Sequence, residues 1–119
     1  MILELHHIQL AMPEGREEEA RAFYGGVLAL REVGKPEELR ARGGAWFESG
    51  TVKVHLGVET PFSPAKKAHP AFRVENLEQA IAVLRLNGLA FRPDIDLPGI
   101  RRIYVEDPFG NRIELLELI

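Results

Sequence analysis

The sequence contains no cysteine, only one tryptophan and no long run of apolar residues. The absence of cysteine excludes disulfides, thiolate nucleophiles and thiolate metal ligands, so any metal would be held by histidine, carboxylate and water. No basic cluster is larger than Lys66-Lys67 or Arg101-Arg102, and the net charge is -3. This charge pattern argues against binding to nucleic acid or to an anionic membrane. The expected partners are a small molecule and a second copy of the chain.

Size and composition predict one globular domain. The chain has 119 residues, of which 45% are hydrophobic, enough to bury a core without disulfides. The first ten residues carry a glutamate and two histidines within a short alternating run. We therefore predict no signal peptide and no membrane span, with the cytoplasm as the location.

The clearest local signal is a hairpin near the C-terminus. Asp107-Pro108-Phe109-Gly110 has the residues that a tight turn favours, and alternating apolar segments lie on both sides. In the outgoing strand, Ile113 and Leu115 share one face, because side chains alternate with a period of two. Glu114 therefore points to the opposite face, where it is either solvated or held for a purpose.

The N-terminal half shows the periodicities of both strands and a helix. Alternation over residues 3–12 predicts a half-buried strand with His7 on its polar face. An apolar stripe then predicts an amphipathic helix that begins at Glu17 and loosens at Gly25-Gly26. The remaining predicted elements of this half are a short strand over 30–33, a polar stretch through Gly44, and a hairpin of strands 45–48 and 51–58.

The same order of elements begins again after a Pro/Lys connector over residues 60–67. The predicted elements are a strand over 69–74, a helix capped by Asn76 and ending near Gly88, a short strand over 89–91, and the C-terminal hairpin. A shift of about sixty residues superposes the halves and maps His7 onto His69 and His55 onto Glu114. We therefore predict a single domain, residues 1–119, built from two repeated modules of about 1–60 and 68–119.

Four side chains are the candidate metal ligands, and they form two repeat-related pairs: His7, His55, His69 and Glu114. Pseudo-twofold packing of the modules would bring the pairs to one point. Imidazoles with one carboxylate leave coordination positions open for substrate, as catalytic metal sites do. These ligands suit zinc, nickel, manganese or iron, so we expect one divalent ion per site. The alternative is that these are ordinary solvated or hydrogen-bonded strand residues.

The same residues carry a resemblance to a known family. The resemblance rests on four features: His7 among alternating apolar neighbours, Phe23-Tyr24 in the first helix, His69 at the start of the second half, and the segment from Asp107 to Glu114. Together they resemble the vicinal oxygen chelate superfamily, which contains glyoxalase I, bleomycin-resistance proteins, fosfomycin-resistance enzymes and extradiol dioxygenases.

The resemblance implies an α+β fold of two βαβββ modules whose mixed sheet curls into a cup, completed by dimerisation. It also implies that His7, His69 and Glu114 are metal ligands. His55 stands where glyoxalase I commonly has a ligand glutamate, which argues against lactoylglutathione lyase activity more than against metal binding. In many dimeric relatives the site is shared between chains, so a homodimer with a shared site is expected.

Strand alternation supplies further candidates for substrate binding. Gln9 shares a face with His7, and Arg73 shares one with His69, so both would point into the cup. Arg73 would then clamp a carboxylate or phosphate with two parallel hydrogen bonds. On sequence alone, a solvated arginine at the edge of the core is an equal alternative.

Two aromatic residues and one acid complete the predicted site. Trp46 and Tyr104 lie on hairpin strands and would wall the pocket, unless they only pack. Glu48 shares a face with Trp46 and is the spare carboxylate for proton transfer, beside Glu114 as the second catalytic candidate.

The leading functional hypothesis is a glyoxalase-like, metal-dependent enzyme of the lyase or isomerase type that chelates vicinal oxygens of a small substrate. One alternative is a metal-free ligand-binding protein of the bleomycin-resistance kind, which sequesters an antibiotic. Another is an iron(II) ring-cleaving dioxygenase, since two histidines and one carboxylate also form the facial triad of non-haem iron.

Overall fold

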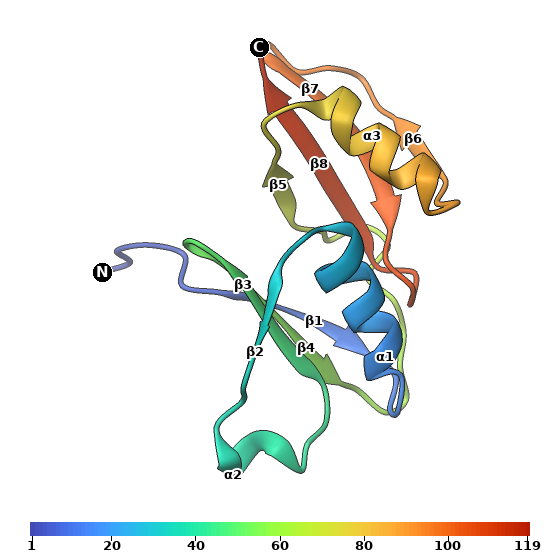
Figure 1. The fold of residues 1–119 in the computed structure, drawn as a ribbon. Coiled ribbons are helices and arrows are strands. Elements are labelled where there is room, and N and C mark those ends of the chain that lie inside the picture. The colour runs from blue at the N-terminus through green and yellow to red at the C-terminus, as the bar shows by residue number, and fades with distance from the viewer. The chain divides into compact units, whose positions relative to one another are not determined.

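The computed structural model describes residues 1–119 and divides the chain into two units, Met1–Pro64 and Ala65–Ile119. Each unit is a four-stranded mixed sheet with helix against one face (Figure 1). The predicted α+β class and the two βαβββ modules are confirmed. No helix in either unit has both the length and the apolar character needed to cross a membrane.

The first unit has the sheet order β1-β4-β3-β2, in which β1 runs parallel to β4 and the other pairs are antiparallel. Its elements are β1 (Ile8–Met12), α1 (Glu17–Ala20), the π-helical segment η1 (Arg21–Val27), β2 (Arg31–Val33), α2 (Glu37–Arg40), β3 (Ala45–Ser49) and β4 (Val52–Val58). The helical segment η1 packs against β2 and β3, where the buried rings of Tyr24 and Phe47 lie 5.7 Å apart. The predicted apolar stripe of the helix is therefore the core side of this unit.

The second unit repeats this arrangement with the order β5-β8-β7-β6, and β5 is parallel to β8. Its elements are β5 (Ala71–Arg73), α3 (Leu77–Leu86), β6 (Phe91–Pro93), β7 (Ile100–Glu106) and β8 (Arg112–Leu118). Buried leucines of α3 pack toward the sheet, against the face that holds Ile113 and Leu115. The opposite face of the sheet is left for polar side chains, Glu114 among them.

The predicted helix cap and hairpin turn are present. The Asn76 side chain accepts a hydrogen bond from the backbone N–H of Gln79 and thereby caps α3. Asp107 accepts hydrogen bonds from the backbone N–H groups of Phe109 and Asn111, each at 2.9 Å. These bonds fix the turn between β7 and β8, and they set the register that places Tyr104 opposite Glu114.

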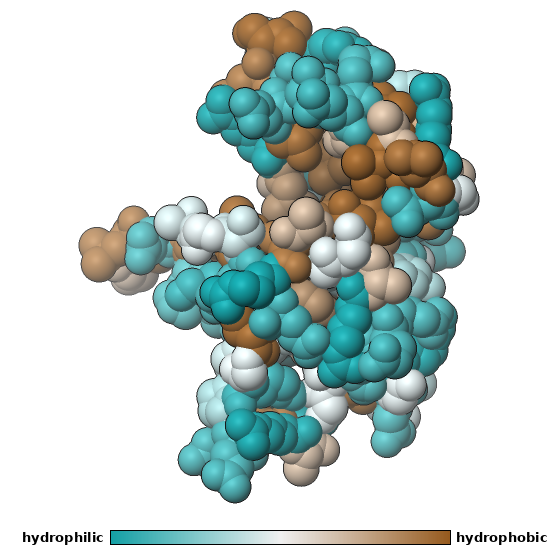
Figure 2. Space-filling view, in the orientation of Figure 1, coloured by the Kyte–Doolittle hydropathy of each residue, from teal (hydrophilic) through white to brown (hydrophobic).

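Four predictions of local structure were wrong. The short strand predicted over residues 89–91 lies at Phe91–Pro93, where it pairs with β7. The first strand starts at Ile8 rather than Leu3, because residues 1–7 have no neighbouring strand and lie exposed. Figure 2 shows the resulting apolar tip of the N-terminal segment at the left. The first helix does not loosen at Gly25-Gly26 but continues through both as π-helical turns, with Leu28 N–H bonded to the Phe23 carbonyl. The stretch before Gly44 holds α2, which has no apolar stripe for periodicity to detect.

Candidate functional site

In the first unit, the two predicted metal ligands lie against each other. His7 immediately precedes β1, and His55 is in β4. Gln9 is paired with His55 in the ladder, and His7 is two residues before Gln9 on the same side of the chain, so the two histidines lie close together. Their rings are stacked with centroids 4.3 Å apart. His7 is exposed, whereas only 6% of His55 is exposed. One imidazole of the pair is thus buried and the other reaches solvent.

Trp46 covers the other side of His55. The two residues are directly opposite in the β3–β4 ladder, and their rings are parallel within 3° at a centroid distance of 3.9 Å. Burial lowers the pKa of His55, and the nearby positive charge of protonated His7 lowers it further, while Glu48 acts in the opposite direction. His55 therefore favours its neutral form, which is the form that binds metal ions.

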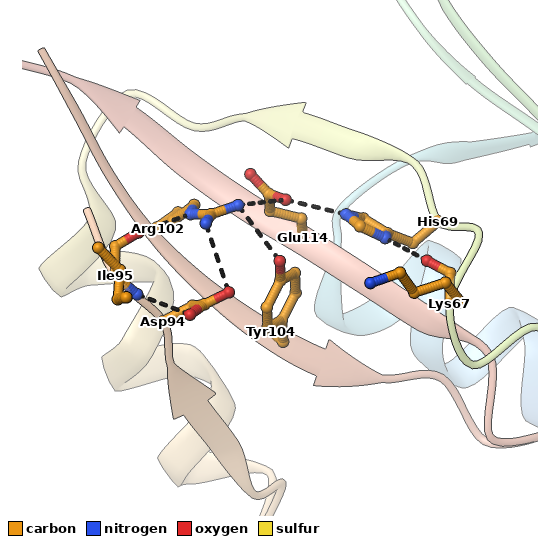
Figure 3. A network of polar contacts seen from close by, with 7 residues as sticks. All are labelled: Lys67, His69, Asp94, Ile95, Arg102, Tyr104 and Glu114. Carbon is orange, nitrogen blue, oxygen red and sulfur yellow. Dashed lines mark hydrogen bonds and ion pairs between the residues drawn. The ribbon is translucent and has the colours of Figure 1, made fainter. Parts of the chain in front are cut away.

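In the second unit, the predicted pair is His69 and Glu114, which come from just before β5 and from β8 (Figure 3). His69 Nε2 lies 2.9 Å from Glu114 Oε1, and His69 Nδ1 lies 2.8 Å from the Lys67 carbonyl oxygen. Because a carbonyl oxygen only accepts, Nδ1 carries a hydrogen and donates it. The Nε2 lone pair then faces a carboxylate oxygen, and a proton or a cation must lie between these two atoms.

Arg102, in β7, also contacts Glu114 and was not predicted as a site residue. Its Nη1 lies 3.4 Å from Glu114 Oε1 and 3.2 Å from the Tyr104 hydroxyl, and its Nη2 lies 3.3 Å from Asp94 Oδ2 (Figure 3). Its Nε donates to the Ile95 carbonyl. The signal available in the sequence was alternation, which places Arg102 on the same strand face as Tyr104. Its contact with Glu114 could not be predicted without knowing the register between β7 and β8.

Tyr104 is the counterpart of Trp46. It is directly opposite Glu114 in the β7–β8 ladder, just as Trp46 is opposite His55. Its ring makes an edge contact with His69 at 5.3 Å between centroids. The hydrogen bond from the Ile95 N–H and that with the Tyr104 hydroxyl lower the pKa of Asp94, and the charge of Arg102 adds to this effect. An aromatic residue thus stands beside the donor pair in both units.

The remaining predicted residues lie on the polar strand faces but do not touch the donor pairs through any hydrogen bond. The Gln9 side chain covers Gly57, where a Cβ atom would come within 2.5 Å of Gln9 Nε2. Glu48 is half-buried in β3 and stands opposite Lys53. Arg73 is exposed in β5, opposite Leu116. The structure leaves their predicted roles in binding and proton transfer as hypotheses.

The strand registers relate the two donor pairs. Gln9 is paired with His55 in the first sheet, and Ala71 is paired with Glu114 in the second. His7 and His69 each stand two residues before these partners. The two halves are therefore equivalent in strand register, and each half presents one side chain from before its first strand and one from its last.

The donor chemistry of the second pair fits a divalent metal ion. Two ligands in adjacent positions of an octahedral ion, each about 2.1 Å from it, stand about 3 Å apart. His69 Nε2 and Glu114 Oε1 have this spacing. A histidine that donates its other N–H to a backbone carbonyl, as His69 does to Lys67, is the usual arrangement around metal ligands. Neither unit alone gathers three or more histidine, aspartate or glutamate side chains that could hold a metal.

Comparison with known proteins agrees with this architecture. A structure of a protein described as of the glyoxalase family from Bacillus anthracis is 48% identical, with a TM-score of 0.96, and covers 100% of this chain and 98% of that chain. Two structures with lower identity show the fold alone. They are the fosfomycin resistance protein FosX from Listeria monocytogenes (17% identity, TM-score 0.79, 100% and 96% covered) and TnmS3, an antibiotic binding protein from a Streptomyces species (19%, 0.75, 100% and 100%).

No curated protein matches the sequence significantly. A family model, however, matches residues 4–115, which include both donor pairs and both aromatic neighbours. With this match and the 48% identical structure, the chain belongs to the Glyoxalase/Bleomycin resistance protein/Dioxygenase superfamily.

Proposed function

We propose that this protein is a glyoxalase-like, metal-dependent enzyme of the lyase or isomerase type, acting on a small molecule with vicinal oxygen atoms. The observation that supports it most is the contact between His69 Nε2 and Glu114 Oε1, in which two electron-pair donors face each other at 2.9 Å. The repeat provides a second pair of candidate ligands, His7 and His55, at equivalent strand positions. Membership of the superfamily is consistent with such an activity.

The residues proposed to hold one divalent ion, whether zinc, nickel, manganese or iron, are His7, His69 and Glu114, with His55 as a further ligand or close neighbour. When bound, the ion supplies Lewis acidity toward adjacent oxygen atoms of the substrate. The Lys67 carbonyl orients His69, and Arg102 restrains the Glu114 carboxylate. We further propose that the ligands are brought together in a cytoplasmic homodimer, with the site shared between chains.

Substrate handling is assigned to the polar faces of the sheets. Glu48 is proposed as the general base, because it is half-buried on the strand face that carries Trp46 and stands near His55. Glu114 is the second candidate for proton transfer. Trp46 and Tyr104 would wall the pocket, and Gln9 and Arg73 would contact polar groups of the substrate.

A second candidate function is metal-free ligand binding, and one contact favours it. The ion pair of Arg102 with Glu114 compensates the charge of that carboxylate without a metal. The structural likeness to the antibiotic binding protein TnmS3 is consistent with this alternative. An iron(II) ring-cleaving dioxygenase uses the same ligand types and differs from the main proposal by the metal it needs.

Elemental analysis by mass spectrometry tests the proposal. Protein incubated with each of the four metals and then desalted should retain near-stoichiometric divalent metal, and His69→Ala and Glu114→Gln should lose it. Glu106→Gln is the matched control, because Glu106 is an exposed acid of β7 away from the donor pair. Absence of metal in the parent protein under all four conditions would favour the ligand-binding alternative. Loss in the control as well would show that the variants act through folding.

A further inference from the structure

A second polar region lies on the sheet of the second unit, beyond His69 and Glu114. It is a groove with a volume of about 580 Å³, at the edge formed by β6 and the β7–β8 turn. The lining residues that matter here are Lys66, Phe91, Arg92, Tyr104, Glu106 and Arg112. Three of these six side chains carry a positive charge, although the chain as a whole has a net charge of -3. Because Asp107 also lines the groove beside Glu106, the three cations exceed the two acids by one.

Two guanidinium groups of the groove contact one aromatic ring. Arg92 is directly opposite Tyr104 in the β6–β7 ladder, and its Cζ lies 4.9 Å from the centre of the Tyr104 ring. Arg112 approaches from β8, with its Cζ 4.8 Å from the same centre. A ring face accepts no hydrogen bond of the usual kind from them, so their N–H groups remain available at the edges of the guanidinium planes.

Neither of these arginines has a carboxylate partner within ion-pair distance, whereas Arg102 is paired with both Asp94 and Glu114. Asp107 accepts hydrogen bonds within its own turn, and Glu106, although opposite Arg112 in the ladder, is exposed and forms no ion pair with it. Two like charges thus lie against one ring without a direct ion pair, although the carboxylate of Asp94 is near enough for the charge of Arg92 to lower its pKa. A bound anion would stabilise such an arrangement.

We propose that Arg92 and Arg112, with Lys66 at the rim, form a binding site for a dianionic oxyanion such as a phosphoryl group. Planar guanidinium groups bind such oxygens through paired, charge-assisted hydrogen bonds, and three positive charges favour a dianion over a single carboxylate. Tyr104, which also contacts His69, would connect this site to the donor pair. The inference deepens the proposed function, because it assigns a charged group to the substrate. The assignment to a substrate rests on the proposed function, whereas the anion site itself does not.

Calorimetric titration with inorganic phosphate tests the site. The protein is first freed of metal with a chelator and desalted, and ionic strength is held constant with sodium chloride. We expect saturable binding in the parent protein, weakened about tenfold or more in Arg92→Gln and in Arg112→Gln, because each removes one charged donor fork. Acetate should bind at least about tenfold more weakly than phosphate, because it carries a single charge.

Arg85→Gln is the matched control. Arg85 also stacks on an aromatic ring, Phe91, at 5.5 Å, but it projects from α3, and its loss should leave phosphate binding unchanged. Arg92→Lys and Arg112→Lys keep the charge and should bind phosphate with intermediate affinity. They test the same positions if a glutamine variant does not fold.

Absence of saturable phosphate binding, or equal affinity in the parent and the folded Arg92 and Arg112 variants, would overturn the proposal. Because the titration uses metal-free protein, a failure here is distinct from a failure to bind metal.

Discussion

The polar faces of the two sheets carry different chemistry at equivalent strand positions. In the first unit, His55 is opposite Trp46 and stacked between two rings, with no arginine against it. In the second, Glu114 is opposite Tyr104 and contacts both His69 and Arg102. One face is thus an aromatic stack around a buried imidazole, and the other is a charged network around a buried carboxylate.

This difference shows what the repeated backbone determines and what it leaves open. Parallel pairing of the first and last strands brings the residue just before the first strand next to a side chain of the last strand in both units. The identity of those side chains then decides whether the pair is neutral or charged. The first pair offers two neutral nitrogen donors, and the second offers one nitrogen and one anionic oxygen, so the proposed metal ligands differ in charge between the units.

The largest expected effect concerns what the units have in common. Leu56 and Leu115 are repeat-equivalent, are 1% and 3% exposed, and lie on the core faces of β4 and β8. Leu56→Ala and Leu115→Ala should each lower the free energy of unfolding by about 2–5 kcal/mol, since each removes buried methyl groups and leaves a cavity. Urea denaturation, monitored by circular dichroism, measures this change in the free energy of unfolding. A cost below 1 kcal/mol for either would contradict the equivalence of the two cores.

The second largest expected effect is a difference in stability between variants of the two hairpin turns. Asn111 is buried, accepts a hydrogen bond from the Ala65 N–H and donates one to Asp107. Asn111→Ala should cost about 1–3 kcal/mol of stability, because it removes the partners of buried polar groups. Thr51→Ala, at the exposed equivalent position after Gly50, should cost less than about 0.5 kcal/mol. Equal losses in denaturant titrations would refute this difference between the turns.

Arg102 has no counterpart against His55, and its removal should change metal binding. Arg102→Gln removes a positive charge from beside Glu114, so the dissociation constant for zinc should decrease by roughly tenfold, equivalent to about 1.4 kcal/mol. Competition with a chromogenic chelator measures this affinity. Arg101→Gln is the control, since Arg101 pairs with Glu78 instead. Weaker zinc binding in Arg102→Gln would mean that this arginine supports the site rather than competes with the metal.

The smallest effect is the pH dependence of the metal-free protein. Burial, and then the charge of His7, lower the pKa of His55 below its ordinary value of 6.5. The unfolded chain therefore takes up a proton near pH 6.5 that the folded chain does not, and stability should fall as the pH falls below this value. Thermal unfolding between pH 5.5 and 7.5 should show a shallower slope in His55→Gln than in the parent. Identical slopes would remove His55 as the cause.

Much of the fold could be predicted because it depends on local patterns. The Asp107 turn, the Asn76 cap and the alternation of β4 and β8 are each encoded by neighbouring residues. The donor pairs could also be anticipated, since the repeat aligned His55 with Glu114. Pairing partners were harder to predict: residues 1–7 alternate like a strand but have no neighbour, and Arg102 reaches Glu114 only through the β7–β8 register.

The central claim is that the donor pairs of both units serve one metal ion, and His7→Ala tests it most directly. His7 is exposed, so its replacement should leave the core of its unit intact. Elemental analysis of the metal-loaded, desalted variant should show the divalent metal reduced to a small fraction of the parent value, as in His69→Ala. Full metal content in His7→Ala, with loss only in His69→Ala and Glu114→Gln, would contradict the claim and assign the ion to the second unit alone.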